Sequence, residues 1–388
     1  MPTLDYQQAI FVCAAYALQP EGGGVQRCTR EYLALMTAAG WQTHPVAYST
    51  DRRLWTRLRR RLAPAPYRNI IPRSFAQTVA EAVQARGAGW VFFNQIEAAP
   101  LIPMLAPLRE AGVRFALLSH GVDSSDYLHE TRIRATLQNG RPISRRDAGW
   151  LGAQLFAEME QHRYCDVVFC LSETDRQLEQ WLGGKAVYVL PRTVDNTPLP
   201  WQPVAGRLGT VGTLVHAPNC EGLVLFCQAL AAQPIGPIRL RLIGSPAEPG
   251  RRLAAQFPFI EYLGPLNDAE FAVEARSWCA FVNPIFCFGR GCSTKLAVPL
   301  SWRLPLATTR AGARGYVWDE NLVPLVETPA DLAQLARQLS DPAQAARQRR
   351  AVEVLAARSP QLADLVPVVQ DALRKADGRL AAPLLRSP

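Results

Sequence analysis

The chain is built from short apolar runs that alternate with stretches of helical periodicity. The first half holds such runs at residues 9–13, 90–93, 115–118, 167–170 and 186–189, with helical patterns between most of them. Short continuous apolar runs are typical of strands that are buried on both faces. Strands that alternate with helices predict an α/β fold, in which a parallel sheet is covered by helices on both sides.

A second series of the same kind follows a proline-rich segment. Residues 191–206 contain four prolines and show no periodicity, which predicts a linker. A second alternating series then starts at residues 208–212 and continues through residues 238–243, 259–263, 280–283 and 304–308. The sequence therefore predicts two doubly wound Rossmann-like domains, residues 1–190 and 207–358, that face each other across a cleft. Residues 359–388 are expected to form a C-terminal helix that returns to the first domain, and a tail.

Composition excludes several classes of protein. The 388 residues are 48% hydrophobic and 19% charged, which is the balance of a compact globular chain rather than of a disordered or membrane protein. The N-terminus lacks the layout of a secretory signal, so we expect a cytoplasmic protein. Nine cysteines without a Cys-x-x-Cys pair or a Cys/His cluster indicate reduced thiols and predict no metal site.

The net charge of +9 comes from arginine, since only three of the 42 basic residues are lysine. Six arginines surround Leu54, Trp55, Leu58 and Leu62 within residues 51–62. This pattern fits a basic amphipathic helix that lies on an anionic membrane, at the inner face of the cell membrane, and equally a surface helix whose apolar side packs on the core. No recognisable nucleic-acid-binding module accompanies the charge.

Two loops of the first domain carry residues suited to ligand binding. Gly23 and Gly24 belong to a glycine run after the first strand, where the backbone could approach a phosphate or a substrate closely; a flexible turn is the alternative. The spacing fits neither a P-loop nor the dinucleotide fingerprint.

The second loop, residues 119–123, follows the strand at 115–118. It places His120 and Asp123 at the carboxyl edge of the sheet, where an imidazole could bind a sugar hydroxyl or move a proton. A purely structural role is the alternative for His120, and helix capping is the alternative for Asp123 and Asp126. We expect His129 to lie on the surface.

The first strand-to-helix loop of the second domain is residues 211–219. Gly212 and Thr213 stand where a ligand could approach the backbone, and Asn219 is expected to cap a helix that begins near Glu221. A capping loop without a ligand is the alternative interpretation.

The segment from residue 283 to 295 has the composition of a diphosphate site. Gly289 and Gly291 bend the chain after a strand, and the hydroxyls of Ser293 and Thr294 come at a helix start. Lys295 and Arg290 supply positive charge, while backbone amides and the helix dipole would receive the phosphates. A solvated basic turn is the alternative interpretation.

Taken together and in this order, these loops resemble the GT-B glycosyltransferases, in particular the bacterial family-4 retaining enzymes. The resemblance rests on the glycine loop, the opening of the second domain and a donor-site segment, which here comprises Pro284, Gly289, Gly291, Lys295, residues 303–309 and residues 312–315. It departs from the family at the nucleotide-facing Val298, where a glutamate normally holds the ribose, at Arg303, where glycine is usual, and at Arg314, where an acidic residue is usual.

The resemblance implies metal-independent transfer of a sugar from a nucleotide diphosphate with retention at the anomeric carbon, as in polysaccharide or glycoconjugate assembly. It implies a nucleotide-sugar donor as substrate, no separate cofactor, and a carbohydrate or lipid-linked acceptor. Lys295 and Arg290 would stabilise the leaving diphosphate, and His120 would contact the transferred sugar. A non-catalytic GT-B-like scaffold and a sugar-nucleotide epimerase are the alternative functions.

Overall fold

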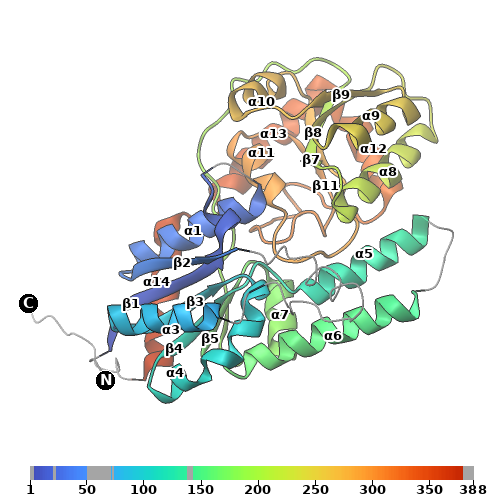
Figure 1. Ribbon diagram of the computed structural model, residues 1–388. Helices are drawn as coiled ribbons and strands as arrows, with labels where there is room; N and C mark the ends of the chain where they lie inside the picture. Colours follow the sequence, from blue (N-terminus) through green and yellow to red (C-terminus); the bar gives the residue numbers. More distant parts are fainter. Residues whose placement is uncertain (1–3, 21–22, 50–70, 72–73, 138–142, 379–388) are drawn as a thin grey trace, which may run out of the picture. The chain divides into compact units, whose positions relative to one another are not determined.

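The computed structural model describes residues 4–20, 23–49, 71, 74–137 and 143–378 (Figure 1). The chain forms two compact units. Unit 1 takes its described residues from 1–124, 144–191 and 362–388, and unit 2 takes its own from 125–143 and 192–361. The two series of strands that the sequence predicts fall into these two units.

Unit 1 is built on a parallel sheet of six strands in the order β2-β1-β3-β4-β5-β6. The strands are β1 (Asp5–Ala14), β2 (Gln42–Tyr48), β3 (Ala88–Asn94), β4 (Arg114–Leu118), β5 (Val167–Cys170) and β6 (Val187–Val189). The central strand β3 is buried along its whole length. This is the pattern expected for a parallel sheet that is covered on both faces.

Helices cover both faces of this sheet. Val79 and Val83 of α3 (Phe75–Arg86) pack against Ile10 and Val12 of β1. Helices α1 (Gly24–Ala38) and α14 (Leu362–Asp377) lie side by side (Figure 1). The other helices are η1 (Ala15–Leu18), η2 (Ile96–Leu101), η3 (Pro103–Leu105), α4 (Ala106–Glu110), α6 (Arg145–His162) and α7 (Glu173–Trp181), while α5 (Asp123–Leu137) begins in unit 1 and continues in unit 2.

Unit 2 contains a parallel sheet of five strands in the order β11-β10-β7-β8-β9. The strands are β7 (Arg207–Thr213), β8 (Arg239–Ser245), β9 (Ile260–Gly264), β10 (Ala280–Asn283) and β11 (Leu306–Thr308). The helices are α8 (Ala217–Ala231), α9 (Ala247–Gln256), α10 (Asp268–Ala275), η4 (Thr294–Leu296), α11 (Ala297–Ser301), α12 (Pro329–Leu339) and α13 (Pro342–Ala357).

The core of unit 2 lies on both sides of its sheet. One layer joins Leu223 and Phe226 of α8 to Leu332 of α12, and the other joins Phe271 of α10 to Val352 of α13. Two doubly wound domains therefore agree with the fold that the sequence predicts.

The strand order places a topological switch point in each sheet. In unit 1, β1 lies between β2 and β3, and in unit 2, β7 lies between β8 and β10. Connections from the two strands at a switch point leave toward opposite faces, which opens a crevice at the carboxyl ends of the strands. The loops after β1 and β3, and after β7 and β10, are therefore the places where a ligand can approach each unit.

Three parts of the fold differ from what the sequence predicts. Strand β2 was missed because it is a largely exposed edge strand that contains Pro45 and so shows no buried apolar run. Residues 192–204 have no regular secondary structure, yet they pack on unit 2, since Val194 and Leu199 are buried in its core. The described part of residues 125–143 belongs to unit 2, although the described residues on either side of this segment belong to unit 1.

Candidate functional site

Lys295 lies at the switch point of unit 2. Its ammonium Nζ donates a hydrogen bond to Oδ1 of Asn219, 2.6 Å away, and so joins the loop after β10 to the first turn of α8. A Cβ added to Gly212 would come within 2.9 Å of Nζ. Glycine at this position of β7 therefore makes room for the lysine.

The ammonium of Lys295 is held in an environment that disfavours its charge. Burial lowers the pKa of Lys295 to about 7, and the positive charge of Arg314 acts in the same direction. An anion placed beside this group would favour the protonated form. The site thus holds a cation whose charge is stabilised by an anionic ligand.

Arg290 and His216 flank a single carboxylate. Oδ2 of Asp126, on α5, lies 3.9 Å from Nε of Arg290 and 3.6 Å from Nε2 of His216. Burial works to raise the pKa of Asp126, but contact with His216 and the charges of Arg290 and Arg314 hold that pKa below its ordinary value. Asp126 is therefore ionised, and it partly neutralises the cations of this loop.

The two glycines of the loop serve different purposes. A Cβ at Gly289 would lie 2.6 Å from Oδ1 of Asp126, so only glycine lets the carboxylate approach the backbone here. Gly291 has a φ of 63°, in the left-handed region that side chains avoid. Both glycines shape the loop that carries Arg290.

The two predicted hydroxyls stand at a short helix start. The Ser293 hydroxyl accepts a hydrogen bond of 3.3 Å from the amide of Asn283, which ties the loop to the end of β10. Thr294 opens η4, a single turn, and α11 has only five residues. A helix this short supplies a weak dipole, so side-chain charge dominates the site. Val298 packs against the core of unit 2.

His120 occupies the corresponding edge of unit 1. Its ring nitrogen Nε2 lies 2.8 Å from Oδ1 of Asn94, the last residue of β3. The aromatic ring of Tyr32 lies 5.6 Å from the imidazole, and its hydroxyl donates to the carbonyl of Ser119. The side chain of His120 is only 9% exposed. The imidazole is therefore held by residues from the helix after β1 and from the strand β3.

The remaining predicted residues of unit 1 lie at helix starts. Gly23 is the N-cap of α1 and Gly24 is its first residue. A Cβ on Gly23 would meet nothing within 4 Å, so a larger side chain at this position would not clash with the protein. Asp123 is the first residue of α5 and is half-buried.

The fold occurs in solved glycosyltransferases. Anabaena Alr3699/HepE, solved with UDP and glucose, is 12% identical to this chain with a TM-score of 0.60, and the match covers 95% of this chain and 99% of that one. Sucrose-phosphate synthase from Thermosynechococcus elongatus is 17% identical with a TM-score of 0.61, over 95% and 98%. The chain has the GT-B fold.

A third similar structure belongs to a longer protein. TarM of S. aureus, solved with fondaparinux, alpha-GlcNAc-glycerol and UDP, is 11% identical with a TM-score of 0.54 over 74% of this chain. The match spans 55% of the length of TarM. No protein-family model and no curated protein sequence matches the chain. At these identities the likeness establishes the GT-B fold.

One expectation about an individual residue was wrong, and a second residue is more buried than expected. Asn219 does not cap the helix, because α8 begins at Ala217 with His216 as its N-cap, and the amide of Asn219 instead joins Thr213 to Lys295. His129 is half-buried: its ring packs on Phe288, with 6.4 Å between the ring centroids, and burial lowers its pKa.

Four residues that were not predicted as site residues lie beside the predicted ones: Asn94, Asp126, His216 and Arg314. Asn94 directly follows an apolar run, which is a signal for a residue at the strand edge. Asp126 and His129 stand three apart, a spacing that places both on one face of a helix. Neither signal says which loop the side chain reaches.

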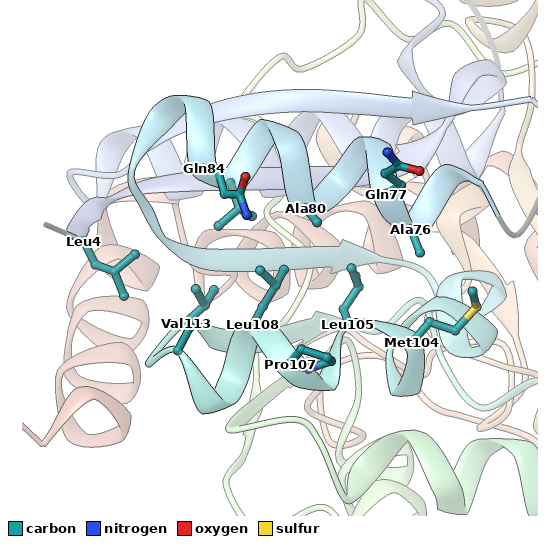
Figure 2. Close-up of a pocket in the computed structure, with 12 residues that line it drawn as sticks. Leu4, Ala76, Gln77, Ala80, Gln84, Met104, Leu105, Pro107, Leu108 and Val113 are labelled. Carbon is teal, nitrogen blue, oxygen red and sulfur yellow. The ribbon is translucent and has the colours of Figure 1, made fainter. Parts of the chain in front are cut away.

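Unit 1 of this GT-B fold also contains an apolar hollow of about 720 Å3. Figure 2 shows it between α3 and the segment that includes η3 and α4. It reaches Leu4 and Val113, next to the amino ends of β1 and β4, and its polar lining residues are Gln77 and Gln84. None of the predicted site residues lines it.

Three expectations from the sequence concern metals, thiols and membranes. Within the described ranges, no three or more His, Cys, Asp or Glu side chains gather as metal ligands would. None of the nine cysteines is joined in a disulfide. Across that same part of the chain, no helix combines the length and the apolar character needed to cross a bilayer. The basic stretch at residues 51–62 lies outside the described residues.

Proposed function

We propose that the protein is a glycosyltransferase that takes its sugar from a nucleotide-diphosphate donor and passes it to a carbohydrate or lipid-linked acceptor. The observation that carries the proposal is the convergence of Lys295, Arg290 and Arg314 around the loops after β7 and β10. These loops flank the switch point of unit 2, where doubly wound sheets bind their ligands.

The proposed chemistry is stabilisation of a leaving diphosphate. Negative charge builds on the phosphate oxygens as the bond to the sugar breaks, and preorganised cations stabilise that charge in a site with little water. Lys295 is suited to this role because its environment disfavours the ammonium until an anion arrives. Retention at the anomeric carbon and independence from a metal ion are part of the proposal, and they rest on the family resemblance.

We assign contacts with the transferred sugar or the acceptor to unit 1. His120 would contact a hydroxyl of the sugar or of the acceptor, with Asp123 as a second polar group in the loop that follows β4. Val298, which packs on the core, leaves the ribose without the glutamate that the family resemblance implies. We therefore propose that the diphosphate contributes more of the donor affinity here than the ribose does.

Calorimetric titration with a panel of nucleoside diphosphates tests the proposal. At least one should bind, and Lys295→Ala should weaken that binding by about 1–3 kcal/mol, the range for a charge-assisted contact. Lys185→Ala is the matched control because it removes the same charge from an exposed position in unit 1. Equal affinities in the two variants would contradict the role of Lys295, and no binding across the panel would contradict the proposed function.

Turnover distinguishes the transferase from the two alternatives. A transferase should release the nucleoside diphosphate only when a suitable acceptor is present, and proton NMR of the product reports the anomeric configuration. Isomerised donor without any acceptor would indicate an epimerase. Donor binding without either product, across a broad set of acceptors, would indicate a scaffold. Sedimentation with vesicles that contain anionic lipid tests the proposed membrane contact of residues 51–62.

A further inference from the structure

A chain of hydrogen bonds runs from α1 through the end of β3 to His120. The Thr29 hydroxyl lies 2.8 Å from the backbone carbonyl of Val25. Nδ2 of Asn94 lies 2.9 Å from the same hydroxyl, and Oδ1 of Asn94 lies 2.8 Å from Nε2 of His120. Thr29 and Asn94 are fully buried. Water therefore does not compete for these contacts.

The directions of these hydrogen bonds follow from counting hydrogens. Two oxygens 2.8 Å apart need a hydrogen between them, and the carbonyl of Val25 has none, so the Thr29 hydroxyl donates to it. That donation uses the only hydrogen of the hydroxyl, which must then accept from Asn94. Only the amide nitrogen of Asn94 can donate. The amide is thereby oriented with its oxygen toward His120.

An amide oxygen accepts and cannot donate, so the ring nitrogen that faces it must carry a hydrogen. We propose that Asn94, oriented by Thr29, is a positioning residue that holds His120 as the Nε2-protonated tautomer. Nδ1 is then the basic nitrogen of the neutral ring. A hydroxyl of the sugar or acceptor that meets Nδ1 would therefore have to donate the hydrogen bond. Toward such a hydroxyl the neutral ring acts as an acceptor and not as a donor.

The role toward substrate rests on the proposed glycosyltransferase function, but the tautomer does not. Nitrogen-15 NMR reads it directly, since protonated and unprotonated ring nitrogens of histidine resonate far apart. The full chain has five histidines, and the signal that His120→Gln removes identifies His120. At about pH 8, where most histidine side chains are neutral, we expect a protonated Nε2 and an unprotonated Nδ1.

Thr29 offers a matched pair of variants. Thr29→Val keeps the shape and removes the hydroxyl, so the amide of Asn94 has no preferred orientation and both tautomers become populated. The two ring nitrogen signals of His120 should then move toward each other. Thr29→Ser keeps the hydroxyl and should retain the wild-type signals. Thr29→Ser removes a buried methyl group and Thr29→Val does not, so a purely structural effect would be larger in Thr29→Ser, the opposite of the expected pattern.

Two results would overturn the inference. One is a protonated Nδ1 in the neutral wild-type ring, which needs no variant to observe. The other is a Thr29→Val spectrum identical to that of the wild type. Once a donor and acceptor are known, Thr29→Val should lower kcat by about tenfold, within the range for proton-transfer groups, while Thr29→Ser stays close to wild type. Failure of nucleotide binding would contradict the proposed function and leave the tautomer result standing.

Discussion

Lys295 shows how a single side chain can be prepared for an anion. Gly212 leaves space for the ammonium, Asn219 accepts one of its hydrogens, and Arg314 repels its charge. Burial and Arg314 make the charged form of Lys295 unfavourable, and this free-energy cost falls when a ligand brings negative charge. Much of the ligand's affinity therefore depends on the protonation of one group.

This arrangement predicts a pH dependence of nucleotide binding. Free Lys295 has a pKa of about 7. A bound diphosphate favours the ammonium and raises that pKa, so above pH 7 binding takes up a proton. UDP affinity should then fall as the pH rises above 7, by up to about tenfold per unit. Calorimetry between about pH 7 and 9 avoids the titration of the phosphate itself, whose second pKa is about 6.

Lys295→Met provides the comparison for this measurement. The variant lacks the titrating group, so its affinity should be lower at about pH 7 and nearly constant up to about pH 9. Proton uptake, read from titrations in buffers of different ionisation enthalpy, should vanish in the variant. If the wild type and Lys295→Met show the same slope with pH, another group is responsible.

Arg303 carries backbone strain at the position where the family resemblance expects glycine. Its φ is 59° and its side chain is 6% exposed, with the guanidinium donating to the carbonyl of Leu300 and the side-chain oxygen of Asn196. Left-handed backbone costs an ordinary residue about 1–2 kcal/mol. The departure from glycine is thus accommodated by hydrogen bonds rather than by relaxation of the backbone.

Comparing Arg303→Gly with Arg303→Ala isolates the strain. Both variants lose the guanidinium, but only alanine keeps a Cβ in the left-handed region. We expect the glycine variant to be more stable than the alanine variant by about 1 kcal/mol in urea denaturation, after the larger chain entropy of unfolded glycine is taken into account. Equal stabilities, or a more stable alanine variant, would show that the backbone relaxes when the guanidinium is removed.

At the scale of elements, the sequence predicted the strands that are buried on both faces of a parallel sheet. Residues 90–93 and 280–282 are apolar because both faces of their strands are covered, and this makes strands and their carboxyl ends visible in the sequence. The loops that carry His120 and Lys295 were therefore placed correctly at strand ends. Strand β2 lacks this signal because it lies at an edge.

The partners of the site residues could not be predicted in the same way. Asn94 meets His120 because β3 and β4 are neighbours in the sheet, and the strand order is a property of the whole fold. Asp126 reaches Arg290 because residues 125–143 join unit 2, which no local pattern indicates. Composition identified the kinds of side chain, and tertiary structure decided which of them meet.

Helix α5 brings a negative charge into the cation cluster of unit 2. Asp126 and a ligand phosphate would interact with the same groups, Arg290 and His216. Asp126→Asn keeps the shape and removes the charge, so we expect UDP to bind more tightly by about 1 kcal/mol, roughly fivefold. Asp319→Asn is the control, because it removes a carboxylate that pairs with Arg358 elsewhere in unit 2. Unchanged or weaker binding in Asp126→Asn would instead make Asp126 a positioning group for these two side chains.

At the scale of the whole molecule, the two units divide the polar groups between two sheet edges. Unit 2 gathers cations after β7 and β10, and unit 1 holds an imidazole after β4. Each unit has its own hydrophobic core and its own switch point. A nucleotide diphosphate should therefore stabilise particular loops rather than the chain as a whole.

Hydrogen–deuterium exchange identifies the loops that the ligand stabilises. With UDP at about 100 times its Kd, a binding site gains about 2.7 kcal/mol of stabilisation, which slows the local opening that exchange requires. We expect slower exchange in residues 212–219 and 287–296, and no change in α3, which serves as the internal reference. Lys295→Ala should remove the protection at the same UDP concentration. Protection centred on α3 and its apolar hollow would place the nucleotide in unit 1 and overturn the division of roles, because the charge that the diphosphate needs lies on the loops of unit 2.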